Sequence, residues 1–262
     1  MEVSTGVAIP QRPALPRRLA GMARTVLSNV VYLHRTSAPW RIYLGYASTL
    51  AKRFHIKRKY RTRESDFRAA MRAGRFSTDW FSVKIPFWIH AFGALDGRAK
   101  TLDVLEIGSW EGMSICFILK SLPNARLTCV NTWGGSDEHA GMKALNQIEA
   151  NFDFNTADYG DRLTKRKQPS AAFFDSCPEQ LQFDFIHIDG SHHARDVMVD
   201  VTKGFAHLRV GGLMILDDYL WRDYDTLNDN PAVAINAFLK TNARKAALVL
   251  VNYQVFLRKI AA

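Results

Sequence analysis

The stretch that decides the fold is TLDVLEIGSWEG, residues 101–112. Its first half is apolar at most positions, which predicts a buried strand. An acid, Glu106, stands at the end of this strand, and Gly108 and Gly112 allow the backbone to turn sharply and lie close to a ligand. A helix expected from Met113 would point its free N–H groups at the same place. This arrangement predicts a nucleotide-type pocket at the carboxyl end of a parallel strand.

The spacing of the glycines excludes two common phosphate-binding loops at this turn. Neither the G-x-G-x-x-G pattern of dinucleotide-binding proteins nor the G-x-x-x-x-G-K-[ST] phosphate loop is present. An acid followed by a looser glycine turn suits a cofactor without a phosphate group, such as S-adenosylmethionine. The same residues can also form an ordinary joint between a strand and a helix, so further motifs are needed to choose between the two.

The composition fits one large domain with an appendage. The 262 residues are 47% hydrophobic, which is enough for a full core. The cysteines Cys116, Cys129 and Cys177 lack the spacing of metal ligands, and we expect free thiols in a reducing compartment. No apolar run reaches the roughly 18 residues that cross a bilayer, and no secretory signal is evident. These observations predict a cytoplasmic protein.

The basic residues are concentrated at the N-terminus. Residues 1–63 contain 13 Lys and Arg and one acid, Glu2, so they carry a net charge of +12. Since the whole chain carries +10, residues 64–262 carry −2. We therefore divide the chain into a basic extension, 1–63, partly disordered or helical, and a catalytic-type domain, 64–262.

The extension leaves several functions open. Residues 1–20 are rich in Pro and Arg and predict disorder, whereas residues 21–60 predict two amphipathic helices separated by Pro39. These helices can pack against the domain or against a second subunit, which would make a homo-oligomer, or they can bind an anionic membrane surface. A mitochondrial-type presequence is a further alternative. Nucleic acid is disfavoured as a partner, because no recognised binding motif accompanies the charge.

Strand and helix patterns alternate from Leu102 onward. Such alternation predicts a doubly wound α/β fold, in which a parallel sheet is covered by helices on both faces. The last two strands are joined by a turn too short for a crossover, so they must be antiparallel. Strands are expected at 102–107, 127–130, within 163–174, and at 183–188, 213–216, 246–251 and 254–258. Helices are expected at 64–98, 113–122, 140–152, 194–208 (capped by Gly211 and Gly212) and 231–239.

Acidic and imidazole side chains follow two of the later strands. Asp189 and His192 follow one of them, and Asp217 and Asp218 follow the next. In a right-handed doubly wound sheet, both strand ends open on the same edge as Glu106. Each group alone has an ordinary explanation as a turn or helix-start residue. Three carboxylates in one cleft instead call for a cation, and oxygen ligands favour Mg²⁺ over Zn²⁺.

The motifs together resemble those of class I S-adenosylmethionine-dependent methyltransferases. Within that class the chain is similar to the metal-dependent branch of macrocin-type sugar O-methyltransferases and their small-molecule relatives. The resemblance covers roughly residues 101–258 and implies a Rossmann-like sheet of seven strands with an antiparallel last strand. The matching pieces are LEIGSWEG at 105–112, NTWGG at 131–135, FDFIHIDGSHH at 183–193 and GGLMILDDYLW at 211–221.

The resemblance also implies roles for individual residues. It places the methionine and ribose parts of the cofactor against the first motif, and it places His192, three residues after the first metal ligand, as the general base. The implied cofactor-binding residues are Glu106, Gly108, Ser109, Gly112, Asn131, Ser170 and Asp189, and the implied metal ligands are Asp189, Asp217 and Asp218.

Asn131 departs from the family pattern, which usually has an acid at the end of the second strand to bind the ribose hydroxyls. An asparagine can still hydrogen-bond a hydroxyl group, but without the charge that strengthens such a bond. We therefore expect weaker cofactor binding, unless another group such as Asp137 takes this role.

The expected function is methyl transfer from S-adenosylmethionine to a hydroxyl group of a small molecule, with Mg²⁺ binding two neighbouring oxygens of a sugar, vicinal diol or catechol. Tyr219, Trp221 and Tyr224 are candidates for the acceptor wall, and residues 222–231 for a lid. One alternative is a metal-independent N- or O-methyltransferase of the same fold. Another is a non-catalytic protein whose basic N-terminus binds a membrane or a partner. A nicotinamide-dependent oxidoreductase is disfavoured by the glycine spacing.

Overall fold

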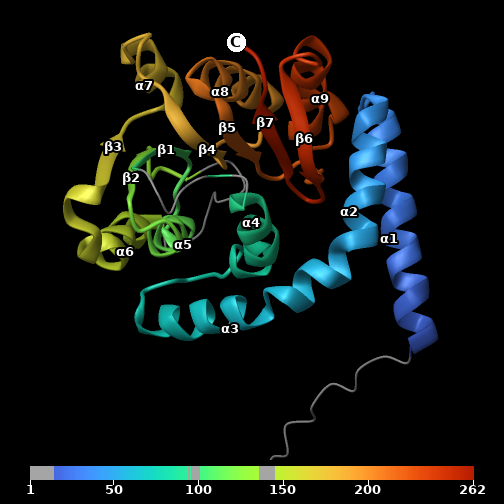
Figure 1. Ribbon diagram of the computed structural model, residues 1–262, viewed down its shortest axis with the longest axis horizontal. Helices are drawn as coiled ribbons and strands as arrows, with labels where there is room; N and C mark the ends of the chain where they lie inside the picture. The colour runs from blue at the N-terminus through green and yellow to red at the C-terminus, as the bar shows by residue number, and fades with distance from the viewer. Residues whose placement is uncertain (1–14, 94, 96–100, 136–144) are drawn as a thin grey trace, which may run out of the picture.

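A seven-stranded sheet forms the centre of the molecule (Figure 1). The computed structural model describes residues 15–93, 95, 101–135 and 145–262. The strand order is β3-β2-β1-β4-β5-β7-β6. Strands β1 to β5 pair in parallel, and β7 is antiparallel to both β5 and β6, which confirms the predicted fold class. The strands are β1 (Leu102–Ile107), β2 (Ala125–Asn131), β3 (Leu163–Lys167), β4 (Phe183–Ile188), β5 (Leu208–Leu216), β6 (Ala246–Val251) and β7 (Val255–Lys259).

Helices cover both faces of this sheet and enclose two hydrophobic cores (Figure 1). Helices α7, α8 and α9 pack on one face, and α4, α5 and α6 pack on the other. Side chains alternate between the two cores along each strand, so Leu105 and Ile107 face one core while Val104 faces the other. The helices are α1 (Leu15–Arg35), α2 (Trp40–Lys59), α3 (Arg61–Ala70), α4 (Ile85–Phe92), α5 (Met113–Ser121), α6 (Leu145–Thr156), α7 (Ser170–Ser176), α8 (Ala194–Ala206) and α9 (Pro231–Thr241).

The structure narrows one expected feature and corrects another. The strand expected within 163–174 is β3 at Leu163–Lys167, and after Pro169 the chain forms a short helix, α7, because proline cannot donate to a strand ladder. Gly211 and Gly212 do not cap α8, which ends at Ala206, but lie inside β5. Gly211 has a left-handed φ of +88° where the register between β4 and β5 shifts, so this glycine is part of a β-bulge.

Three other expectations hold only in part. The helix expected over 64–98 is broken into α3, two short 3-10 turns and α4. The helix expected from residue 140 begins at Leu145 among the described residues, and residues 136–144 lie outside them. Residues 1–14, part of the segment expected to be disordered, are also outside the described residues, whereas 15–20 belong to α1.

Helices α1 and α2 form an antiparallel pair beside the β6 end of the sheet (Figure 1). Ile42 of α2 belongs to the core under α9, and Ile56 of the same helix belongs to the core on the opposite face. Between them, Thr49 Oγ1 accepts a hydrogen bond from the backbone N–H of Val251 over 3.0 Å. The Arg41 guanidinium donates to backbone carbonyls after α9, including that of Ala246 at 2.9 Å. The extension therefore packs against the main domain, as one of the alternatives expects.

The predicted domain boundary between residues 63 and 64 falls inside α3, and it stays a prediction. None of the helices in the described ranges combines the length and the apolar character needed to cross a membrane. The three cysteines are free thiols, two of them buried.

Candidate active site

The turn after β1 is held tightly against the end of β4. Gly108 has a left-handed φ of +82°, and its N–H group donates to the Val130 carbonyl oxygen over 2.9 Å. A Cβ atom at Gly108 would lie 1.9 Å from the Asp189 carbonyl oxygen, so only glycine fits. Gly112 has a φ of +84° and precedes the first turn of α5. The predicted cofactor turn and the predicted acidic cluster are therefore in direct contact.

Glu106 is fully buried, on the same side of the sheet as Val104 and α5. Its Oε1 lies 2.8 Å from Nδ1 of His187, its neighbour across the sheet on β4. Its Oε2 has no hydrogen-bond partner among the described residues. Buried polar atoms are nearly always satisfied, so this oxygen beside a glycine turn fits a polar ligand group. Ser109, also predicted to bind the cofactor, is buried with its hydroxyl group near the Cys129 thiol.

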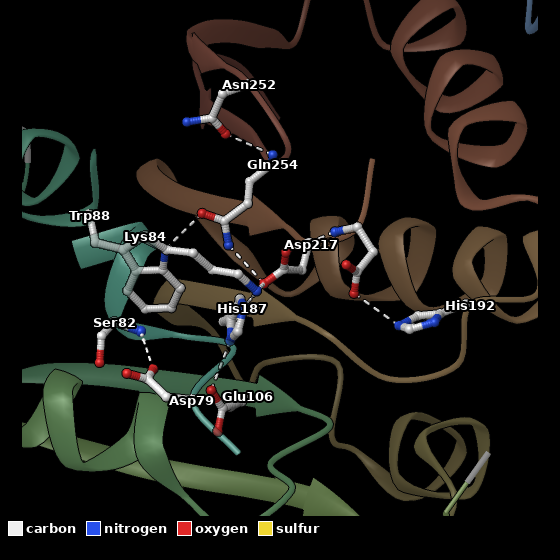
Figure 2. Close-up of polar contacts among 11 residues, drawn as sticks. Asp79, Ser82, Lys84, Trp88, Glu106, His187, His192, Asp217, Asn252 and Gln254 are labelled. Atoms are coloured by element: carbon white, nitrogen blue, oxygen red, sulfur yellow. Dashed lines mark hydrogen bonds and ion pairs between the residues drawn. The ribbon is translucent and has the colours of Figure 1, made fainter. Parts of the chain in front are cut away.

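The Asp217 carboxylate is the point where the polar contacts of the site converge (Figure 2). Its Oδ2 lies 2.5 Å from Lys84 Nζ and 2.8 Å from Gln254 Nε2. His187 Nε2 approaches the same oxygen at 3.5 Å. The other oxygen, Oδ1, accepts a hydrogen bond from the backbone N–H of Asp218 over 2.8 Å. Asp217 thus accepts three hydrogen bonds, two of them from side chains that are distant in the sequence.

These contacts shift the pKa of several groups. Although burial lowers it, hydrogen bonds to Asp217 and Glu106 raise the pKa of His187 to about 10. Burial opposes the effect, but Lys84 and His187 hold the pKa of Asp217 well below its ordinary value. Burial, and after it the charge of Asp217, raise the pKa of Asp189 well above its ordinary value. Asp217 is therefore a paired anion, whereas Asp189 is a half-buried carboxylate that a cation would stabilise.

Asp189, His192 and Asp218 form the outer part of the cluster. Each offers one ligand atom, and these atoms lie within 4.8 Å of one another. Asp218 has a left-handed φ of +53°, which is rare for a residue other than glycine. Its Oδ2 lies 2.9 Å from His192 Nε2. Carboxylate and imidazole ligands at this spacing fit a divalent cation. His187, Asp189 and Asp217 form a second group within the same distance.

Aromatic side chains from the segment after β5 lie against the two histidines. The rings of Trp221 and His192 are 4.8 Å apart, and those of Tyr224 and His193 are stacked at 4.3 Å. Both aromatic residues can therefore border an acceptor. Tyr219, expected beside them, is fully buried and donates its hydroxyl group to a side chain of α9. It is a core residue, so its assignment to the acceptor wall was wrong.

The remaining predicted residues lie at neighbouring strand ends. Asn131 is the last residue of β2 and is half-buried. Ser170 is the first residue of α7 and is half-buried beside Asp200 of α8. Asp137, the alternative ribose-binding acid, lies outside the described residues. The cofactor roles of Asn131 and Ser170 stay predictions.

The sequence analysis missed four residues of the polar network: Lys84, Trp88, His187 and Gln254. His187 carried a signal, because a histidine in the middle of an apolar strand needs a buried partner. Lys84 precedes α4, and Gln254 precedes β7, so neither is near a recognised motif. Only the tertiary fold brings them to Asp217.

Comparison with known proteins finds similar sequences. Residues 105–219 match a family model described as a methyltransferase domain. A curated relative, the mycinamicin VI 2''-O-methyltransferase of Micromonospora griseorubida, is 27% identical over 136 residues, which make up 49% of this chain and 30% of that protein. These matches confirm the predicted resemblance to class I S-adenosylmethionine-dependent methyltransferases of this branch.

Two solved structures share the fold. The MycE methyltransferase from the mycinamycin biosynthetic pathway, in complex with Mg, SAH and mycinamycin VI, aligns with a TM-score of 0.50 and 18% identity. The alignment covers 70% of this chain and 51% of that one. A Klebsiella pneumoniae protein assigned as an O-methyltransferase aligns with a TM-score of 0.50 and 19% identity, over 76% of this chain and 89% of that one. The chain spans less than a third of the curated relative and about half of the MycE chain.

Proposed function

We propose that this protein, whose residues 105–219 match the model of a methyltransferase domain, transfers the methyl group of S-adenosylmethionine to a hydroxyl oxygen of a small molecule. One observation carries this proposal. The glycine turn that would hold the cofactor lies against the first residue of the acidic cluster, so closely that a Cβ atom at Gly108 would overlap the Asp189 backbone. A methyl donor on this turn and an acceptor at the cluster would be neighbours.

The cofactor would bind at the carboxyl ends of β1 and β2. The buried Glu106 Oε2 is available to the amino group of its methionine part, and the glycine turn lets the backbone come close. Asn131 and Ser170 are the proposed contacts to the ribose and the adenine. When bound, S-adenosylmethionine supplies an activated methyl group to a nucleophile that approaches in line. Alignment of the two bound reactants can supply roughly 7–11 kcal/mol of the barrier.

His192 is the proposed general base. Its Nε2 lies 2.9 Å from Asp218 Oδ2, so the carboxylate orients the imidazole and increases its basicity. The ring also lies against Trp221, which restricts its rotation. Removal of the hydroxyl proton by such a base contributes about 10²–10⁴ in rate.

The outer cluster is the proposed site of a divalent ion, with Mg²⁺ favoured by its carboxylates. When bound, the ion supplies a positive charge that lowers the pKa of the acceptor hydroxyl. Asp189 and Asp218 would hold it. The Mg bound in the MycE structure supports this proposal. An ion that binds paired oxygens favours an acceptor with adjacent hydroxyl groups, such as a sugar, and the name of the curated relative points the same way.

The test has two stages. Calorimetric titration with S-adenosylhomocysteine, with and without Mg²⁺, measures cofactor binding, and a panel of sugars and catechols then measures methyl transfer. We expect binding without the metal, and methyl transfer that EDTA abolishes and Mg²⁺ restores. Full activity in EDTA would favour the metal-independent methyltransferase instead. Absence of S-adenosylhomocysteine binding in both conditions would overturn the proposed function.

The outer face of α2 is a proposed contact with an anionic membrane surface. Trp40, Leu44 and Phe54 recur at helical spacing on the side away from the core, and their exposed fractions are 73%, 60% and 77%. The sequence contains no acid between Glu2 and Glu64, so the positive charge around this face is unopposed. Sedimentation with phosphatidylserine vesicles should retain the protein, and a Trp40→Ala/Phe54→Ala variant should remain in solution. Equal binding to neutral vesicles, or a dimer in light scattering, would argue against anionic lipid.

A further inference from the structure

Three hydrogen bonds from the protein occupy most of the accepting capacity of Asp217. Its side chain is fully buried, and its two oxygens receive Lys84 Nζ, Gln254 Nε2 and the backbone N–H of Asp218 at 2.5–2.8 Å. His187 Nε2 lies 3.5 Å from Oδ2 and has no hydrogen-bond partner among the described residues. Each carboxylate oxygen has about two lone-pair sites, so Lys84 and Gln254 fill Oδ2, whereas Oδ1 accepts one hydrogen bond. A metal ion on Oδ2 would have to displace a donor, and the ammonium group of Lys84 repels a second cation from the whole carboxylate.

The Gln254 amide is fixed in its orientation by Trp88. The indole nitrogen of Trp88 can only donate, and it lies 2.9 Å from Gln254 Oε1 (Figure 2). The amide nitrogen of Gln254 must therefore be the atom that faces Asp217. The Gln254 amide cannot rotate to turn its oxygen toward a cation at Asp217, because the Trp88 indole N–H would then lose its acceptor.

Hydrogen bonds and an ion pair fix the segment 79–84, which carries Lys84 to the cluster. The Asp79 carboxylate accepts a hydrogen bond from the Ser82 N–H over 2.8 Å and pairs with Arg68 at 2.6 Å. The Lys84 N–H then donates to the Phe81 carbonyl oxygen over 2.8 Å and leads into α4. The Lys84 side chain is only 15% exposed, so its charge is directed into the protein. Lys84 and Trp88, one helical turn apart, thus both act on Asp217.

The charges of the cluster divide accordingly. The ammonium group of Lys84 balances the carboxylate of Asp217. Asp189 and Asp218 form no ion pair with a lysine or arginine of the described residues, and Asp218 Oδ2 lies 2.9 Å from the imidazole of His192. Two adjacent carboxylates without a permanent positive partner suit one divalent ion.

We propose that Lys84 is a built-in counter-ion that keeps Asp217 out of the metal coordination sphere, so that Asp189 and Asp218 are the carboxylates that hold the divalent ion. The inference rests on the proposed function only for the presence of a metal site. Asp217 is then a positioning residue, which holds the Asp218 backbone and the segment that carries Lys84. The site would differ from one with three coordinating carboxylates by a lower metal affinity.

Metal affinity can be measured without turnover, by electron paramagnetic resonance of Mn²⁺ added to the full-length protein. The variants are Asp189→Asn, Asp218→Asn, Lys84→Met, Lys84→Arg and the double variant Lys84→Met/Asp217→Asn. We expect Asp189→Asn and Asp218→Asn to lose Mn²⁺ binding. Lys84→Met should bind at least about tenfold more tightly, because a third carboxylate becomes available. Lys84→Arg, which keeps the charge, should match the wild type.

The double variant is the decisive one, since it removes Asp217 as a ligand without leaving an unpaired buried charge. It should bind Mn²⁺ within about threefold of the wild type. Loss of Mn²⁺ from the double variant would place Asp217 in the coordination sphere and overturn the proposal, and so would unchanged affinity in Lys84→Met. Circular dichroism and thermal unfolding check that each variant is folded. A wild-type protein that binds S-adenosylhomocysteine but no Mn²⁺ would refute this inference and leave methyl transfer standing.

Discussion

Replacement of Asp200 by asparagine is expected to stabilise the protein. Asp200 lies on α8 with an exposed fraction of 1%, and its Oδ1 has no hydrogen-bond partner among the described residues. Burial raises its pKa from 3.8 to about 6, against the opposing effect of the Ser170 hydroxyl group. The folded protein therefore carries a carboxylate whose charge is poorly compensated. Asparagine has nearly the same shape and no charge.

The magnitude follows from the pKa difference. An increase of roughly 2 units corresponds to about 3 kcal/mol at pH 7, where the group is ionised in both states. For a chain of this length, about 3 kcal/mol corresponds to an increase of about 5 °C in Tm. The sign of the pH dependence is defined too. The penalty is present above pH 6 and disappears as the pH falls toward 3.8, so the gain of the variant should be about half as large at pH 5.

Thermal unfolding of the wild type and Asp200→Asn at pH 7 and pH 5 measures this effect. Asp175→Asn is the matched control, because it makes the same chemical change in an exposed ion pair with Lys203 and should change stability by less than about 0.5 kcal/mol. An unchanged or lower Tm for Asp200→Asn at pH 7 would refute the reasoning. An equal gain at both pH values would show that the effect is not electrostatic.

Three further changes test other parts of the structure. Gly108→Ala should cost about 3 kcal/mol in chemical unfolding, because its Cβ would meet the Asp189 backbone in a left-handed conformation, and an unchanged midpoint would contradict the turn geometry. Asn131→Asp should tighten S-adenosylhomocysteine binding about tenfold in calorimetry, since a charged acceptor strengthens the ribose hydrogen bond; weaker binding would exclude that contact. Thr49→Val should cost about 1–2 kcal/mol in urea unfolding, because the Val251 N–H loses its acceptor, and no loss would mean that water replaces the hydroxyl.

The sequence predicted the bounds of some strands better than those of others. β1, β4 and β6 have the predicted bounds, because each is a largely apolar segment between clear turn signals, whereas β5 begins five residues before the predicted strand. β3 is short and mostly polar, and its end could not be separated from the helix that follows Pro169. Gly211 looked like a helix cap because a glycine after a helix usually is one. A bulge in β5 depends on pairing with β4, which no local pattern records.

Some residues of the site could likewise be predicted from the sequence and others could not. Asp189, His192 and Asp218 could be predicted because strand ends on one edge of a parallel sheet must lie near one another. The ion pair between Asp217 and Lys84 could not be predicted, because the two residues lie 133 positions apart in the chain. A cation supplied by the protein itself looks, in the sequence, like any other surface lysine.

The position of α2 along β6 bears on any shortened form of the protein. β6 is the last strand of the sheet, and an uncovered outer strand offers free N–H and C=O groups to strands of other molecules. Thr49 satisfies one of these N–H groups, and the close approach at Gly45 lets the helix lie directly on Val251. Deletion of residues 1–63 would remove this cover and open both cores beside it. Such a truncation should be prone to aggregation through sheet extension, although the whole methyltransferase domain match would be intact.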